Sequence, residues 1–362
     1  MRSNLACIPV ACLAACATTA PEIPAAGTPA VRVVADMGRV AASWPAAPQE
    51  PAELFDVVKV VDGDTIHILR GGEVVRLRLL SVDTEEKISG RPSTSSTKPE
   101  TIFGQETAVW ARDFFEELRE GDSRPRVGLR FPNGVERNDV YGRLLSHVLL
   151  PDGTDFNLLL VREGKSPYFN KYGNSRICHT ELVAAQVEAR RKQLGIWNPA
   201  TNEPKTPGAP KAKRPYDRLL PWWQARAEAI DAFREKNHAE PQRVVAADEP
   251  EALERARVWC AAEEGRTALV FGTIDRFFEE DDGSLTVLFR ATDRRRAFRA
   301  VIPADARAAL GVLDLRGRTE EFRQNYLFVE GVLEQGPRGT RTVAARPEQW
   351  RAAGPEPVLP PE

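Results

Sequence analysis

The sequence is poor in the features that would place it in several large protein classes. Its five cysteines include no CxxC pair, which excludes a zinc ribbon and a disulfide scaffold. Its 50 Lys and Arg nearly balance 52 Asp and Glu, and a net charge of −2 excludes a strongly basic nucleic-acid coat protein. Its apolar runs fall far short of the ~20 residues that a membrane-spanning helix needs. A local basic cleft stays compatible with this composition, because the field that a ligand meets is local.

What the chain does contain is enough apolar sequence for packed cores, at 42% hydrophobic residues. Its 362 residues exceed the usual size of one domain, so we expect two. Shifts in composition divide the chain into a signal peptide at 1–15, a flexible tether at 16–52, a first domain at 53–198, a proline-rich basic linker at 199–221, a helical segment at 222–265, a second domain at 266–350 and a tail at 351–362.

The N-terminal segment carries a short targeting pattern. Arg2 precedes a mostly apolar stretch interrupted by Pro9, and Leu13-Ala14-Ala15-Cys16 follows. This run resembles the lipobox of bacterial lipoproteins, in which cleavage precedes the cysteine and the cysteine is acylated. We therefore expect a lipid anchor on Cys16 and an extracytoplasmic place in the cell envelope, since acyl chains hold a protein to a membrane surface. The alternative is an ordinary secretory signal and a secreted protein.

Alternating and helical spacings in 53–198 predict a small mixed domain. Strands are expected at 55–61, 65–69, 74–82, 127–131 and 144–149. Helices are expected at 107–118, 157–163 and 180–195. Five short strands wound with helices predict an α+β domain built on an OB-type β-barrel.

Acidic and basic residues gather where the predicted strands end. Asp62-Gly63-Asp64 forms a tight turn, and Asp83-Thr84-Glu85-Glu86 follows the next long strand, which carries Arg78. Carboxylates that meet repel one another unless some are protonated or a cation lies between them. Oxygen ligands without His or Cys favour Ca²⁺ or Mg²⁺, and arginines match a phosphate. A cation, arginines and a spare carboxylate suit phosphodiester hydrolysis, although each motif alone is also typical of a solvated turn.

The order of these motifs resembles one family. The chain has Val60-Val61-Asp62-Gly63-Asp64-Thr65, Arg78-Leu79-Leu80-Ser81-Val82-Asp83-Thr84-Glu85-Glu86, Gly104-Gln105-Glu106, Tyr141-Gly142-Arg143 and Gly195-Ile196-Trp197. Over about 145 residues this set is similar to the staphylococcal nuclease (thermonuclease) family. The resemblance implies an OB barrel with three helices. It also implies a Ca²⁺-dependent phosphodiesterase that acts on DNA and RNA and leaves 3′-phosphate ends.

The resemblance also implies a role for single residues. Asp64 and Asp83 match the family's metal carboxylates, and the backbone carbonyl of Thr84 matches its third protein ligand. Arg78 and Arg143 match the arginines that bind the phosphate and stabilise its developing charge.

Further positions match a second carboxylate pair and the substrate contacts of the family. Glu86 matches the carboxylate usually taken as general base, a role disputed in the family, and Asp62 matches a carboxylate beside the metal. For the substrate we expect Tyr141, Tyr168 as the ring that stacks on a base, and Phe169 in place of a second tyrosine, with core packing as the equal alternative for Phe169. Glu85 stands where the family usually has proline, and the added charge could raise the pKa of Glu86 or bind a second cation.

The C-terminal part predicts a second barrel. Expected strands at 268–277, 285–291, 298–302, 326–334 and 340–344, with a helix at 304–310, follow an OB-like order. This part has no Asp-Gly-Asp turn, so we expect it to bind rather than cleave. Its partner would be single-stranded nucleic acid, through Arg294-Arg295-Arg296 and Arg299, or an envelope protein. A solvated charged hairpin explains the same arginines.

The function expected from the sequence is therefore a Ca²⁺-dependent nuclease for DNA or RNA, anchored in the bacterial cell envelope. The alternative is a catalytically weak or inactive protein that uses two OB barrels to bind nucleic acid or to scaffold the envelope. The basic linker is expected to be a solvated spacer, with steering of phosphates as the other option.

Overall fold

The computed structural model of the chain describes residues 50–89, 95, 97–204 and 212–361. The predicted signal peptide, Cys16 and nearly all of the predicted tether lie outside the described residues. The described residues all belong to one compact unit. Among the described residues no helix has both the length and the apolar character that a membrane span requires.

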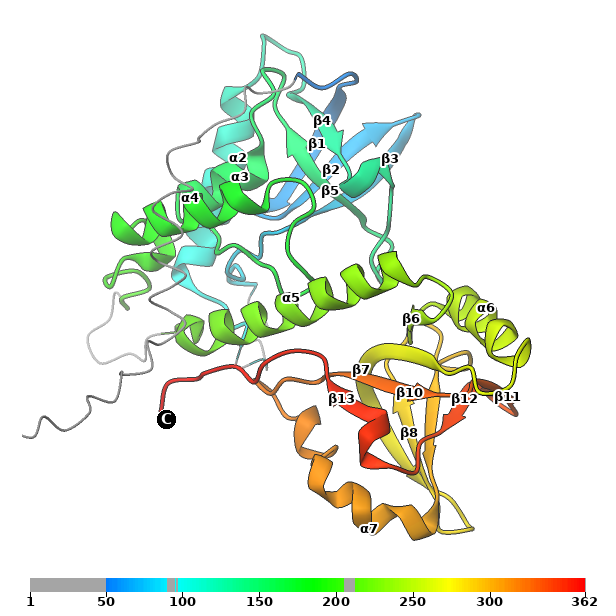
Figure 1. The fold of residues 1–362 in the computed structure, drawn as a ribbon. Helices are drawn as coiled ribbons and strands as arrows, with labels where there is room; N and C mark the ends of the chain where they lie inside the picture. The colour runs from blue at the N-terminus through cyan, green and yellow to red at the C-terminus, as the bar shows by residue number, and fades with distance from the viewer. Residues whose placement is uncertain (1–49, 90–94, 96, 205–211, 362) are drawn as a thin grey trace, which may run out of the picture. The chain divides into compact units, whose positions relative to one another are not determined.

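The first domain is a closed five-stranded barrel (Figure 1). Its strands are β1 (Phe55–Asp62), β2 (Thr65–Arg70), β3 (Glu73–Leu79), β4 (Arg126–Arg130) and β5 (Leu144–Leu149). They close in the order β1-β2-β3-β5-β4, with β3 and β5 parallel and the other pairs antiparallel. Gly71 and Gly72 turn the β2–β3 hairpin at positive φ, which glycine adopts without strain. The predicted OB-type barrel is confirmed.

Three helices pack on this barrel, close to where their periodicity predicts them. They are α2 (Ile102–Glu117), α3 (Phe156–Arg162) and α4 (His179–Arg191). Thr101 and Asp155 cap α2 and α3 by accepting hydrogen bonds from the backbone N–H groups of Gly104 and Leu158. The aromatic rings of Phe115 and Phe156 pack against each other in a tilted arrangement, with centroids 4.8 Å apart, and hold α2 against α3.

A long helix follows the first domain, and it overturns one expectation. Helix α5 runs over Tyr216–Ala239, through Pro221, although prolines were expected to forbid a continuous helix up to 221. Pro221 lies in the second turn, where it removes one intrahelical bond, and its neighbours Leu219, Trp222 and Trp223 are buried. Tertiary packing therefore outweighs the local cost of the proline. Strand β6 (Val244–Ala246) and helix α6 (Pro250–Ala261) come next.

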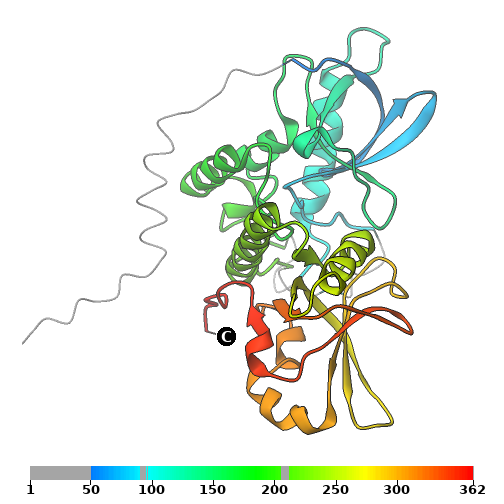
Figure 2. The same cartoon turned by 45° about the vertical axis from the view of Figure 1, so that its right-hand side comes forward.

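The C-terminal part forms an eight-stranded sheet, and five of its strands follow the order of the first barrel without the pairing that closes that barrel. Strands β7 (Ala268–Glu279), β8 (Leu285–Phe289), β9 (Arg299–Ile302), β10 (Tyr326–Gly331), β11 (Glu334–Gly336), β12 (Gly339–Val343) and β13 (Trp350–Ala352) are arranged as β11-β12-β9-β8-β7-β10-β13. Strands β7 and β10 are antiparallel and β9 and β12 are parallel, as β1·β4 and β3·β5 are in the first barrel. The short helix α7 (Arg307–Leu310) lies between β9 and β10, and β7 and β8 form a long hairpin (Figure 2).

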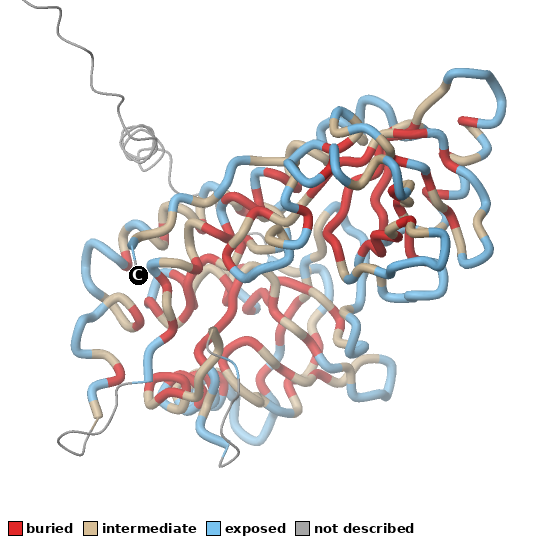
Figure 3. The backbone as a smooth tube through the Cα atoms, turned by 90° about the horizontal axis from the view of Figure 1, so that it is seen from below, coloured by how far each residue is buried: buried red, intermediate tan, exposed pale blue. Residues whose placement is uncertain are grey.

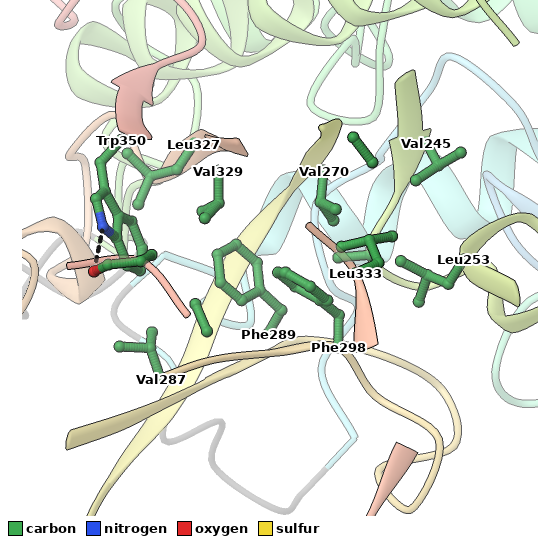
Figure 4. Packing of buried hydrophobic residues seen from close by; sticks show 14 of the residues in the cluster. Val245, Leu253, Val270, Val287, Phe289, Phe298, Leu327, Val329, Leu333 and Trp350 are labelled. Atoms are coloured by element: carbon green, nitrogen blue, oxygen red, sulfur yellow. Dashed lines mark hydrogen bonds between the residues drawn. The ribbon is translucent and has the colours of Figure 1, made fainter. Parts of the chain in front are cut away.

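Each sheet has its own apolar interior, and the buried segments of the backbone are drawn in red in Figure 3. In the C-terminal core the rings of Phe289 and Phe298 lie 5.3 Å apart (Figure 4). The indole of Trp350 packs beside them and donates a hydrogen bond to the carbonyl of Ala344. Strand β13, which the sequence did not predict, thereby closes one end of this core.

Candidate active site

The β1–β2 turn places two carboxylates beside the loop that follows β3. The backbone N–H of Asp64 faces the Asp62 carboxylate at 3.4 Å, and the Asp64 carboxylate accepts bonds from both the backbone N–H and the hydroxyl of Thr84, at 2.9 and 3.2 Å. A Cβ at Gly63 would lie 2.6 Å from the methyl carbon of Thr84. Only glycine lets these two loops approach so closely.

Arg78 joins the two predicted metal carboxylates. It lies on β3 directly opposite Thr65, and its neighbours Leu77 and Leu79 fill the barrel, so Arg78 lies on the outer face. Its guanidinium makes ion pairs of 2.5 Å to Asp64 and 2.6 Å to Asp83. Burial works against its charge, but these carboxylates outweigh burial and raise the pKa of Arg78.

Asp83 is only 1% exposed and contacts three cations. One carboxylate oxygen contacts Arg78 and, at 2.8 Å, the ammonium of Lys98, and the other contacts Arg214 at 2.7 Å. Burial alone would raise the pKa of Asp83, but these three cations lower it well below its usual range. Asp83 is therefore an ionised carboxylate whose two oxygens are both engaged.

The sequence analysis predicted neither Lys98 nor Arg214 at the site, and the more deeply buried of the two is Arg214. It was grouped with a linker expected to be a solvated spacer, yet it is 1% exposed. Besides its ion pair, it donates bonds to the backbone carbonyls of Asp83 at 3.0 Å and Thr97 at 3.1 Å. Its guanidinium also lies over the rings of Tyr216 and Trp223. The excess of positive charge in 199–221 was the available signal, but nothing in it marks Arg214 rather than its neighbour Lys213.

Glu86 is the half-exposed carboxylate at the edge of this cluster. Its side chain is 3.8 Å from the ammonium of Lys98. Burial raises the pKa of Glu86, with Lys98 opposing and Asp64 and Asp83 adding to the rise. In the same way burial and the nearby Asp64 raise the pKa of Asp62 to about 6. Both carboxyl groups are thus better proton acceptors than free ones.

Glu85, which replaces the family's usual proline, faces away from Glu86 and into the protein. It is 3% exposed and accepts hydrogen bonds from the hydroxyl of Thr101 at 2.6 Å, the amide of Asn202 at 2.8 Å and the hydroxyl of Tyr216 at 3.2 Å. Its carboxylate is engaged by these three donors inside the protein, so it is not an open ligand for a second cation in this arrangement. Glu85 instead ties the site loop to the start of α5.

Arg143 lies on the same outer face as Arg78 but is held by another carboxylate. In the parallel pair of β3 and β5, Leu77 lies opposite Leu144, so Arg143 lies beside Arg76. Asp139 accepts from Nε and Nη2 of Arg143, each at 2.7 Å, and among the described residues Arg143 forms no ion pair with Asp64 or Asp83. The ring of Tyr141 is 71% exposed and lies 5.6 Å from this guanidinium.

Tyr168 and Phe169 do not offer the stacking surface that the resemblance implies. Tyr168 is 3% exposed, and its hydroxyl binds His179 at 2.8 Å and the N–H of Ser175 at 2.8 Å. Phe169 packs edge-on against Trp223 of α5, with centroids 4.8 Å apart. Residues of the first domain itself cover Tyr168, and α5 packs on Phe169, so of the three expected substrate contacts only Tyr141 is exposed.

The donor chemistry of the cluster fits a hard cation. Carboxylate and carbonyl oxygens of Asp64, Asp83 and Thr84 are the ligand type that Ca²⁺ prefers. Lys98 and Arg214 supply two positive charges at Asp83, which equals the charge of a divalent ion. A cation that binds Asp83 would have to displace one of them. The cluster thus combines oxygen ligands, an arginine bridge and a basic carboxylate at one barrel edge.

Comparison with known proteins places this site in a family. The staphylococcal nuclease homologue model matches residues 76–199. An uncharacterized endonuclease of Escherichia coli O157:H7 is 30% identical over 148 residues, which cover 41% of this chain and 79% of that protein. Thermonuclease of Staphylococcus intermedius is 33% identical over 147 residues, 40% of this chain and 76% of that protein. Endonuclease YhcR of Bacillus subtilis is 32% identical over 159 residues, 42% of this chain but 12% of that protein. The chain belongs to the staphylococcal nuclease family.

Proposed function

We propose that this protein is a Ca²⁺-dependent nuclease that hydrolyses phosphodiester bonds of DNA or RNA and leaves 3′-phosphate ends. The observation that carries the proposal is the bridge of Arg78 between Asp64 and Asp83 at the end of the barrel. The names of the relatives, thermonuclease and endonuclease, support the same reaction class.

The residues of the site divide the chemistry between them. Asp64, Asp83 and the carbonyl of Thr84 would hold the cation, which supplies charge to polarise the phosphate and its attacking water. The carboxylate of Glu86 would accept the proton of that water, for which its raised pKa suits it.

The arginines would serve the phosphate. Guanidinium groups match phosphate oxygens and stabilise the charge that develops as the phosphodiester is attacked. Arg78 already lies between the two carboxylates, and Asp139 fixes two of the three nitrogens of Arg143, leaving Nη1 for the phosphate. Tyr141, exposed beside Arg143, would contact the sugar or base.

The test is cleavage of labelled single-stranded DNA by the full chain, in Ca²⁺ and in EGTA. We expect cleavage in Ca²⁺ alone, and products that accept a new phosphate at the 5′ end without prior treatment but resist extension until their 3′-phosphate is removed. Equal cleavage in EGTA would contradict the dependence on Ca²⁺. Products that a polymerase extends without treatment would contradict the 3′-phosphate ends.

One observation favours the second candidate, a nucleic-acid-binding protein with weak or no turnover. Both oxygens of Asp83 are occupied by Arg78, Lys98 and Arg214, which neutralise the site without a metal. A chain that binds oligonucleotide equally in Ca²⁺ and EGTA but cleaves in neither would favour this candidate.

We also propose that Cys16 is acylated and anchors the protein extracytoplasmically in the cell envelope. The Leu13-Ala14-Ala15-Cys16 run supports this. Wild-type chain expressed in a bacterial host should partition into detergent, and Cys16→Ser should abolish that partition. An unmodified mature N-terminus at another residue, found by mass spectrometry, would refute the anchor and leave a secreted protein.

A further inference from the structure

A basic groove lies on the C-terminal sheet, and none of the residues that line it belongs to the candidate active site. It has a volume of about 800 Å³. Six arginines line it against a single acidic residue, Glu254: Arg276, Arg294, Arg295, Arg296, Arg299 and Arg338. They come from β7, the β8–β9 loop, β9 and the β11–β12 hairpin.

The strand register explains why arginines meet there. Leu288 of β8 pairs with Arg276 of β7 on one side and with Arg299 of β9 on the other. Side chains in register on adjacent strands lie on the same face. The backbones of Arg276 and Arg299, on either side of Leu288, are therefore about 10 Å apart, which is twice the strand spacing. A β-bulge between Ile274 and Arg276 sets this register on β7.

Much of this positive charge is not neutralised. Arg276 and Arg294 share one carboxylate, that of Asp275, at 3.2 and 3.5 Å. Arg295 and Arg338 form no ion pair with any residue that the structure describes. Arg299 donates to the carbonyls of Ala297 and Arg338, and burial together with the Arg338 guanidinium lowers its pKa. Because the whole chain carries −2, this is a local concentration of one sign and points to an anionic ligand.

The groove also offers apolar surface between its charges. Phe278 of β7 lines it and is 39% exposed, two residues from Arg276 on the same side of the strand. Pro337 of the β11–β12 turn lines it as well. Alternating guanidinium groups and an open aromatic ring are the combination that binds a nucleic-acid strand whose bases are unpaired, because a ring can stack on a base only when that base is free.

We propose that this groove binds single-stranded nucleic acid, with phosphates on the arginines and a base on Phe278. The proposal goes beyond the nuclease reaction, since the groove would bind a strand whether or not the barrel site cleaves it. A strand held there stays at a raised effective concentration for the site in the same chain. Groove variants should therefore weaken cleavage of long strands and leave cleavage of a dinucleotide unchanged.

The test uses the full chain in EGTA and a fluorescein-labelled dT15, with anisotropy read from 50 to 200 mM KCl. The groove variant is Arg295→Ser with Arg338→Ser, the two arginines without ion pairs. The matched control is Arg316→Ser with Arg351→Ser, which removes the same charge from exposed positions outside the groove. Each lost phosphate contact on a single strand should reduce the slope of log affinity against log salt by about 0.7, so the groove variant should lose about 1.4.

The control should keep the wild-type slope. Phe278→Ser should weaken binding by about fivefold or more at every salt concentration, without a change in slope, because a lost stacking contact releases no counterions.

The outcomes separate this inference from the proposed function. If the chain binds dT15 through the groove but never cleaves DNA, the proposed nuclease function is refuted and the binding role of the groove is supported. If the chain cleaves DNA in Ca²⁺ and the groove variant keeps the wild-type affinity and salt slope, the binding role of the groove is overturned and the nuclease function is supported. Wild-type chain that does not bind dT15 at 50 mM KCl also overturns the proposal, and an acidic protein then becomes the partner to test.

Discussion

At the scale of single residues, the surroundings of Asp83 govern how the site can take up a cation. Lys98 and Arg214 each occupy a carboxylate oxygen that a metal ligand would offer. Lys98 is partly exposed and can swing into solvent, whereas Arg214 is buried and held by two backbone carbonyls as well. Binding of a cation at the Asp83 oxygen that Arg214 holds requires the release of Arg214, so these two events are linked, and the linkage acts in both directions.

This linkage predicts the effect of Arg214→Ala. Without the guanidinium, Asp83 is open to a cation, so the Ca²⁺ concentration for half-maximal cleavage should fall by about fivefold or more. Lys213→Ala, which removes an exposed charge one residue away, should leave that concentration unchanged. A Ca²⁺ titration of the cleavage rate of both variants measures this concentration. A higher Ca²⁺ requirement in Arg214→Ala would instead make Arg214 a support of the ion site.

Glu86 gives a second prediction at this scale. Glu86→Gln keeps the size of the side chain but cannot accept a proton, so turnover should fall by about 10²–10⁴-fold. The Ca²⁺ concentration for half-maximal cleavage should change little, because Asp64 and Asp83 are unaltered. Glu117→Gln, at an exposed position on α2, is the control. Equal loss of turnover and of Ca²⁺ affinity would place Glu86 among the metal ligands.

At the scale of elements, a buried carboxylate ties the loop after β3 to the N-terminal end of α2 and to α5. Glu85 accepts from Thr101, the N-cap of α2, from Asn202 and from Tyr216 in the first turn of α5. Removing the Glu85 carboxylate leaves three buried donors without an acceptor, and each unsatisfied donor costs free energy.

We therefore expect Glu85→Ala to lower the free energy of unfolding by about 3 kcal/mol in urea titrations. Glu73→Ala, at an exposed position on β3, should change it by less than about 0.5 kcal/mol. Glu85→Gln retains one acceptor oxygen, so its loss in the free energy of unfolding should lie between those of the other two variants. An unchanged stability of Glu85→Ala would mean that these hydrogen bonds contribute nothing net.

The elements also show where sequence reasoning succeeds. Strands β1 to β5 follow their alternation, and the turn residues Gly63, Gly71 and Gly72 fall where close approach or positive φ requires glycine. The helix through Pro221 and the short strand β13 were not predicted. Both are decided by packing against distant residues, which local propensity does not encode.

At the scale of the whole molecule, the same limit applies to the site. Asp64, Arg78 and Asp83 lie within 20 residues, on neighbouring strand ends, and their spacing predicts that they meet. Arg214 reaches Asp83 from 131 residues away along the chain. Tyr168 has the sequence context of a substrate-binding ring, and only the packing around it, including His179, shows that it is covered.

The measurement that tests the account most directly is the cleavage rate of Arg78→Lys on single-stranded DNA in saturating Ca²⁺. An ammonium lacks the planar fork with which the Arg78 guanidinium contacts Asp64 and Asp83, and it cannot match a phosphate with two parallel bonds. Losing such a charge-stabilising donor should cost about 3–4 kcal/mol, a 10²–10³-fold fall in rate. Arg70→Lys, which alters an exposed ion pair to Glu136 on the same barrel, should cleave like wild type. Wild-type activity in Arg78→Lys would contradict the assignment of this cluster as the active site.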